Sequence, residues 1–278
     1  MKNFHWSLRF FVFLLITFVI VIFDFLTISI QPTFITAPLN FFAVALVNAS
    51  LLFLAVSLST ASGWRLFLVI FLAYYALTGF LVGIETVYLP EQLPLDIAIR
   101  VLINAGIAAI LLTGISIYFF GDKGKTQTPN ATARKTSWIS WLWKLFLSGI
   151  VWMFLFVLVG LFVFQPLAKA LDEPAAIQYL AEFSGNQDDG IKILLFQIGR
   201  GIIWAVMILP WLISLRVRRW HAVLLAGGVC AGWLGSTFFT PTGIPALIQI
   251  AHLVEMITEN FLYGAWLGFL FFPKKSST

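Results

Sequence analysis

Charged residues and cysteine are both scarce in this sequence, and each shortage excludes a class of protein. Only 10% of the 278 residues are charged, whereas 60% are hydrophobic and 17% are aromatic. A water-soluble chain of this composition would lack the polar surface needed to cover its core. The single cysteine, Cys230, excludes an internal disulfide. Because no long polar segment is present either, the composition predicts one multi-pass membrane domain.

Apolar runs recur along the chain, and each has about the 20 residues that a helix needs to cross the hydrocarbon core of a bilayer. Their number predicts an all-α bundle of eight transmembrane helices. The expected spans are Phe10–Ile30, Phe41–Thr60, Arg65–Val87, Leu95–Phe120, Ile139–Phe164, Ile191–Ser214, Trp220–Phe239 and Pro245–Phe272.

The first and seventh of the expected loops carry no charge, whereas basic residues gather in alternate loops. Those of the fourth and sixth loops are Lys123, Lys125, Arg134, Lys135, Arg216, Arg218 and Arg219. Under the positive-inside rule these loops face the cytoplasm. The net charge of +5 is therefore interpreted as an orientation signal and not as a nucleic-acid-binding surface. We expect a protein of the cytoplasmic or plasma membrane with both termini in the cytoplasm.

The sequence also contains a sparse internal repeat. A shift of 151 residues superposes Pro90 on Pro241 and Pro94 on Pro245, so that in both places two prolines precede a long final span. An even number of spans in each repeat makes the two copies parallel in the membrane. We expect two parallel four-helix halves, residues 1–120 and 139–278, joined by a cytoplasmic linker at residues 121–138.

Ionisable side chains interrupt the last apolar run. His252, Glu255, Glu259 and Tyr263 recur at helical spacing and fall on one stripe of the expected helix. Ionisable residues inside a membrane span mark a functional site by default, and histidine ordinarily titrates between about pH 5 and 8. We therefore expect His252, Glu255 and Glu259 to carry protons or a cation, with Asn260 beside them as a substrate-binding residue.

Four further polar residues fall in the outer halves of other expected spans. Arg100 and Asn104 share a stripe of the fourth span, Arg200 lies in the sixth, and Glu85 lies near the outer end of the third. Exposure of such groups to lipid is costly, so we expect them to line a cavity that opens outward. Two arginines in this set favour a small polar or anionic solute. As an alternative, the same charges pair helices within the bundle.

Three functions fit this pattern, and the leading hypothesis is a transporter or permease coupled to protons or a cation. An intramembrane enzyme acting on a lipid or peptide near the outer leaflet would use the acidic stripe as acid and base groups or as metal ligands. A structural subunit would use the charges to contact a membrane-protein partner or a second copy of the chain. The sequence has no phosphate-binding loop, nucleophile elbow or His-Glu-x-x-His pair, so no cofactor or metal is expected and no catalytic residue is assigned.

Overall fold

A computed structural model of the chain confirms the all-α class. It describes residues 2–28, 38–80, 83–84, 95–121, 137–170, 187–239 and 246–272, and every regular element within these ranges is helical. Six of the helices are long and apolar enough to cross a membrane. The structure divides into two compact units, which are described separately.

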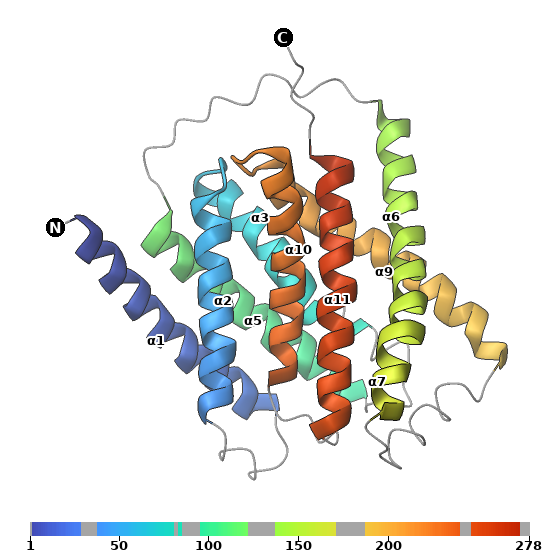
Figure 1. The fold of residues 1–278 in the computed structure, drawn as a ribbon. Coiled ribbons are helices and arrows are strands. Elements are labelled where there is room, and N and C mark those ends of the chain that lie inside the picture. The colour runs from blue at the N-terminus through green and yellow to red at the C-terminus, as the bar shows by residue number, and fades with distance from the viewer. Residues whose placement is uncertain are drawn as a thin grey trace. The chain divides into compact units, whose positions relative to one another are not determined.

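Unit 1 comprises Met1–Pro129 and Met207–Val217. Its helices are α1 (Lys2–Ile28), α2 (Pro38–Ser57), α3 (Gly63–Tyr75), the π-helical segment η2 (Ala76–Phe80) and α5 (Leu95–Phe120) (Figure 1). Phenylalanine rings join α1, α2 and α5, because Phe120 makes edge-on contacts with Phe13 and Phe53 at centroid distances of 5.2 and 4.9 Å. Edge-on ring pairs add to the stabilisation that burial alone provides.

Two short connections pair with each other inside unit 1. The amide of Thr60 donates to the carbonyl of Ser214 at 2.7 Å, and the amide of Arg216 donates to the carbonyl of Leu58 at 2.8 Å. The hydroxyls of Ser59 and Ser214 add a contact of 2.8 Å. The loop after α2 and the loop after α9 thereby satisfy each other's backbone groups.

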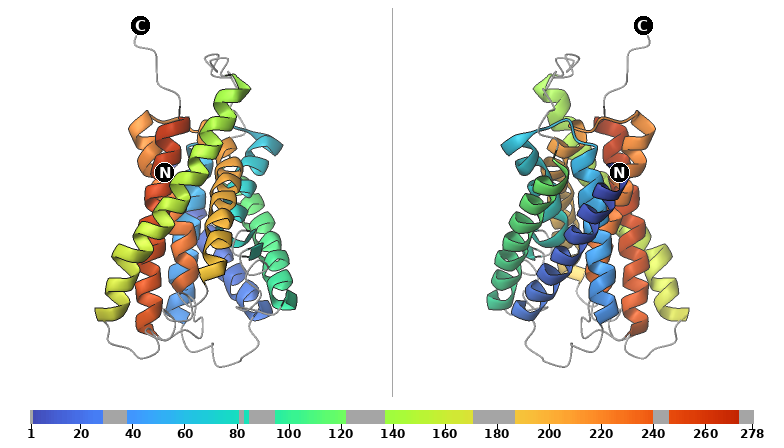
Figure 2. Two further views of the ribbon diagram at one scale, coloured as in Figure 1. Left: turned by 90° about the vertical axis from the view of Figure 1, so that its right-hand side faces the viewer. Right: turned by 90° about the vertical axis from the view of Figure 1, so that its left-hand side faces the viewer.

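Unit 2 comprises Asn130–Val206 and Arg218–Thr278. Its elements are α6 (Trp138–Val159), the π-helical segment η3 (Gly160–Phe164), α7 (Gln165–Ala170), most of α9 (Gln187–Ile213), α10 (Arg219–Ser236), η4 (Thr237–Phe239) and α11 (Ala246–Phe271). Helices α10 and α11 lie side by side in opposite directions, with α6 on the other side of α11 (Figures 1 and 2).

Glycines allow α10 and α11 to approach closely. A Cβ atom added to Gly264 would lie 2.4 Å from the carbonyl oxygen of Ala226, and one added to Gly227 would lie 2.8 Å from that of Phe261. No side chain larger than hydrogen fits at such distances without separating the helices. Small residues at helix crossings are the usual means by which membrane helices pack together.

A helix lies in each of the eight expected runs, and α5 has the predicted bounds. Helices α10 and α11 are not among the six helices that are long and apolar enough to cross a membrane. Arg219 and His221 lower the hydropathy of α10, and Glu255 and Glu259 lower that of α11. Their crossing of the membrane, the internal repeat and the division into two four-helix halves stay predictions. Glu85 lies outside the described residues.

Candidate functional site

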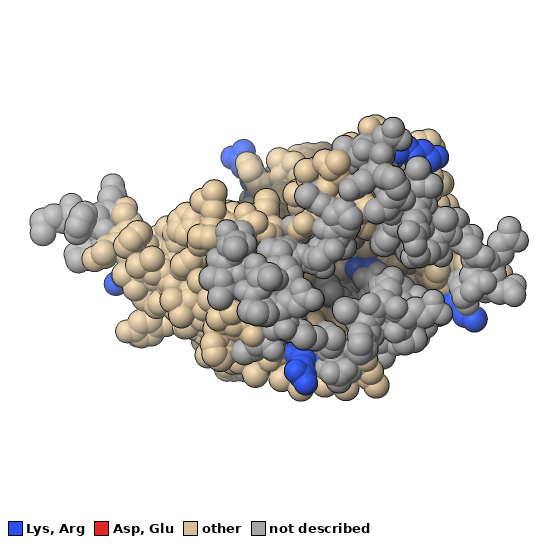
Figure 3. Space-filling model, turned by 90° about the horizontal axis from the view of Figure 1, so that it is seen from below, with Lys and Arg blue, Asp and Glu red and all other residues tan. Residues whose placement is uncertain are grey.

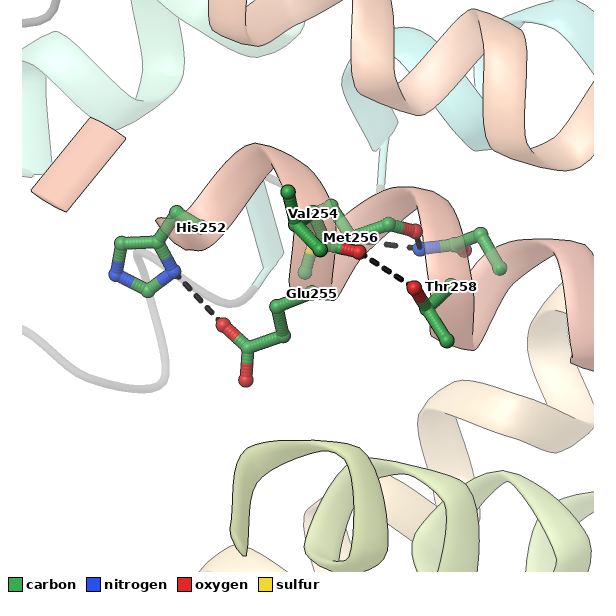
Figure 4. A network of polar contacts seen from close by, with 6 residues as sticks. His252, Val254, Glu255, Met256 and Thr258 are labelled. Carbon is green, nitrogen blue, oxygen red and sulfur yellow. Dashed lines mark hydrogen bonds and ion pairs between the residues drawn. The ribbon is translucent and has the colours of Figure 1, made fainter. Parts of the chain in front are cut away.

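The first polar contact of α11 joins His252 to Glu255. The Nδ1 atom of His252 lies 2.9 Å from the Oε2 atom of Glu255, and the two side chains lie on the same side of the helix (Figure 4). Helical spacing of three residues makes this contact possible. The side chains keep 17% and 9% of their surface exposed, so the pair lies at the rim of the unit's interior.

The π-helical segment η3 faces this pair. The ring of Phe164 stacks on the imidazole of His252 with a centroid distance of 4.4 Å. A Cβ atom on Gly160 would lie 3.6 Å from Oε1 of Glu255, so the carboxylate lies against the part of the helix that has no side chain. The amide of Gln165 bonds the carbonyl of Gly160, five residues earlier, as π-helical geometry requires. Such π-helical turns occur frequently at functional sites.

The polar stripe of α11 continues to Glu259, and Asn260 lies beside the stripe; both residues are fully buried. The Asn260 Nδ2 group donates to the carbonyl oxygen of Met256 at 2.8 Å, one turn earlier on the same helix. Its Oδ1 atom is buried and has no hydrogen-bond donor among the described residues. A buried amide oxygen is ordinarily satisfied, so this atom requires an N–H or O–H partner that the described residues do not provide.

Arg200 is buried within a set of aromatic rings. Its guanidinium carbon lies 4.7 Å from the ring centroid of Trp204 and 5.5 Å from that of Trp152, and the residue is 3% exposed. The indole Nε1 of Trp152 donates to Oε1 of Gln197 at 2.8 Å. Cation–π contacts of this kind hold a guanidinium in place and strengthen as water is excluded.

Tyr263 joins the Arg200 cluster to α11. Its hydroxyl donates to the carbonyl of Gly201, and its ring lies edge-on to Trp152 at 5.1 Å. We define the Arg200 cluster as Gln197, Arg200 and Trp204 of α9, Trp152 of α6 and Tyr263 of α11. Because Tyr263 lies one helical turn beyond Glu259, the acidic stripe and the cluster occupy successive turns of one helix.

Sequence reasoning identified part of this arrangement and missed the rest. It singled out His252, Glu255, Glu259, Asn260 and Arg200, and the structure brings the first two into contact. It missed the residues that surround them, which are Trp152, Gly160, Phe164, Gln197 and Trp204. Gln197, Arg200 and Trp204 recur at helical spacing on one face of α9, and this pattern could have indicated the cluster from the sequence.

The remaining predicted residues lie in unit 1. Arg100 is exposed on α5, and Asn104 lies one turn later on the same helix and is half-buried. Their role in substrate binding stays a prediction. No three His, Cys, Asp or Glu side chains within the described ranges come together in a way that could hold a metal ion.

The acidic residues of α11 are interior groups and not surface groups. Figure 3 shows separate Lys and Arg side chains on one face and, among the residues that the structure describes, no Asp or Glu. Glu255 and Glu259 are 7% and 0% exposed.

Comparison of the chain with protein-family models, with curated proteins and with solved structures found no match.

Proposed function

We propose that this chain is an eight-helix transporter of the cytoplasmic membrane that binds a small polar or anionic solute along the polar stripe of α11 and couples its movement to protons. The six apolar helices support a membrane location. So do large apolar side chains that point away from the units, such as Phe23, Phe162 and Ile191, which are 66%, 74% and 70% exposed. Surfaces of this kind are stable when lipid covers them.

Burial of Glu259 is the observation that carries this proposal. A carboxylate with no exposed surface inside an apolar bundle costs several kcal/mol unless it is neutralised or paired. Helices α10 and α11 already pack closely through Gly227 and Gly264, so the bundle has an apolar means of assembly. Ionisable side chains inside a membrane bundle are functional by default, so we interpret the burial of Glu259 as functional.

Each part of the site has a distinct role in the proposed mechanism. His252 and Glu255, at the rim, exchange protons with the outside, and Glu259 holds a proton deeper in the unit. Arg200 supplies a fixed positive charge that favours an anionic solute. Asn260 offers its Oδ1 atom as an acceptor for the same solute.

A solute screen followed by uptake tests this function. Thermal unfolding of the purified protein is measured with amino acids, monocarboxylates, dicarboxylates, sugars and inorganic phosphate, because a ligand that binds the native state raises the unfolding temperature. Uptake of the stabilising solute into proteoliposomes is then followed with a radiolabel. We expect one chemical class to stabilise the protein and to be taken up, and stabilisation by none of them would contradict the proposal.

Asn48 provides a matched control for Asn260. Both are buried asparagines whose Nδ2 group donates to the carbonyl four residues earlier, at 2.9 Å for Asn48 and 2.8 Å for Asn260. We expect Asn260→Ala to abolish uptake and Asn48→Ala to retain it. Equal uptake by the two variants would remove Asn260 from the solute site.

A further inference from the structure

Two basic side chains hold the C-terminal end of α11. The ammonium of Lys144, from α6, donates to the carbonyl of Leu270 at 3.1 Å, and Arg219, from α10, donates through an NH2 group to the carbonyl of Phe269 at 2.7 Å. Both cations also lie over aromatic rings, Lys144 over Phe271 at 5.7 Å and Arg219 over Phe269 at 4.4 Å. The two charges are thus bound to the carbonyls of successive residues at one helix end.

Acidic groups are distant from this end of unit 2 in its described residues. Helices α6 and α10 contain no acid, and neither does α9 from Gly190 onward. Glu259 is the last acid of α11 and lies 11 residues before Leu270, which is about 16 Å along the helix. The carbonyls at the helix end carry only partial charges, so Lys144, Arg218 and Arg219 leave a net positive charge there.

Aromatic side chains surround the same charges and are strongly exposed. Trp138, Trp143 and Trp220 are 70%, 63% and 67% exposed, and they lie within the first two turns of α6 and α10. Indole rings at the ends of apolar helices are typical of the boundary between hydrocarbon and headgroups. Two N–H donors beside Phe269, Arg219 Nε and Trp266 Nε1, have no acceptor in the described part of the chain.

We propose that the basic end of unit 2, where α11 ends and α6 and α10 begin (Figure 1), binds the headgroup of an anionic phospholipid. The lipid phosphate lies between Lys144 and Arg219 and supplies the negative charge and the acceptor oxygens that the described residues do not provide there. The exposed tryptophans set the depth of the headgroup, and the apolar faces of α6 and α10 contact its acyl chains. This site does not depend on whether the chain transports a solute.

The test measures binding of phosphatidylglycerol by native mass spectrometry and by thermal unfolding in detergent. The variant Lys144→Gln with Arg219→Gln removes the two charges of the site. The control, Arg9→Gln with Arg65→Gln, removes two cations that also lie over aromatic rings but are exposed and belong to unit 1. We expect about 30-fold weaker binding in the first variant, because each basic residue near an anionic surface contributes roughly fivefold.

A charge-exchanged variant and two control ligands distinguish recognition of the anionic headgroup from misfolding and from nonspecific lipid or phosphate binding. The exchange Lys144→Arg with Arg219→Lys keeps both charges, so we expect it to retain phosphatidylglycerol even if the neutral variant folds poorly. Phosphatidylcholine and inorganic phosphate serve as a zwitterionic lipid and a free anion. The proposal would be overturned if the neutral variant bound phosphatidylglycerol as the wild type does, or if the control lost binding to the same extent. It would also be overturned if the charge-exchanged variant lost binding, or if phosphatidylcholine or inorganic phosphate stabilised the protein equally.

Discussion

The imidazole Nδ1 of His252 lies 2.9 Å from the Oε2 of Glu255, at the N-terminal end of a stripe whose burial increases along α11. The exposed fraction falls from 17% for the His252 side chain to 0% for the whole of Glu259. A proton that reaches the rim pair is therefore one helical turn from a carboxylate that water does not contact. This gradient of burial is the geometric basis of the proposed proton coupling.

Replacement of His252 by glutamine should alter the pH dependence of solute binding. Glutamine keeps a hydrogen-bonding group beside Glu255 but cannot gain a proton between pH 8 and 5, as histidine ordinarily does. We expect binding by the wild type to change over this range and binding by His252→Gln to stay constant, measured by thermal stabilisation at each pH. His221→Gln is the control, because His221 is an exposed histidine at the beginning of α10. A pH profile that His252→Gln leaves unaltered would make His252 a packing residue.

Alanine at Gly264 should destabilise the contact between α10 and α11. Its Cβ atom would lie 2.4 Å from the carbonyl oxygen of Ala226 and 2.8 Å from the sulfur of Cys230. Overpacking of this kind typically costs about 1–3 kcal/mol of unfolding free energy, which denaturation in mixed micelles measures. In Gly228→Ala the new Cβ atom meets nothing within 4 Å, so we expect that variant to be unchanged or more stable. Equal stability of the two variants would contradict the close crossing.

Lysine in place of Arg200 should weaken the cluster around it. A compact, strongly hydrated ammonium does not reproduce the contacts of a guanidinium that lies 4.7 and 5.5 Å from the ring centroids of Trp204 and Trp152. We expect a loss of about 1–2 kcal/mol in unfolding free energy. The matched change Arg100→Lys, at an exposed position of α5, should stay within about 0.5 kcal/mol. Similar losses at both positions would show that the aromatic rings do not stabilise Arg200.

Hydropathy and helical periodicity predicted the elements of this fold better than the surroundings of the site. The bounds of α5 and the stripe from His252 to Tyr263 follow from residue spacing alone, because helix formation and helical faces are local properties. The π-helical turn that places Gly160 and Phe164 opposite His252 leaves hydropathy unchanged, so no pattern indicated it. Trp152 meets Arg200 only through the packing of α6 on α9, which depends on tertiary structure.

Cysteine labelling in intact cells should establish the orientation of the loops. The basic fourth loop is predicted to be cytoplasmic and the fifth to be outside, so a cysteine at Thr128 should resist an impermeant thiol reagent and one at Asn186 should react. Both positions lie outside the described residues. Cys230 is fully buried, and Cys230→Ala supplies a background without reactive thiols. Labelling in the opposite pattern would invert the predicted topology.

Proton-driven uptake in the Glu259→Gln variant tests the central claim most directly. Glutamine preserves the size of the buried side chain at Glu259 and removes its titration. The stabilising solute is supplied to proteoliposomes with and without an inward proton gradient. We predict that the gradient increases uptake severalfold in the wild type and has no effect in Glu259→Gln, while the solute still raises the unfolding temperature of the variant. Stimulation of Glu259→Gln by the gradient to the wild-type extent would contradict the account.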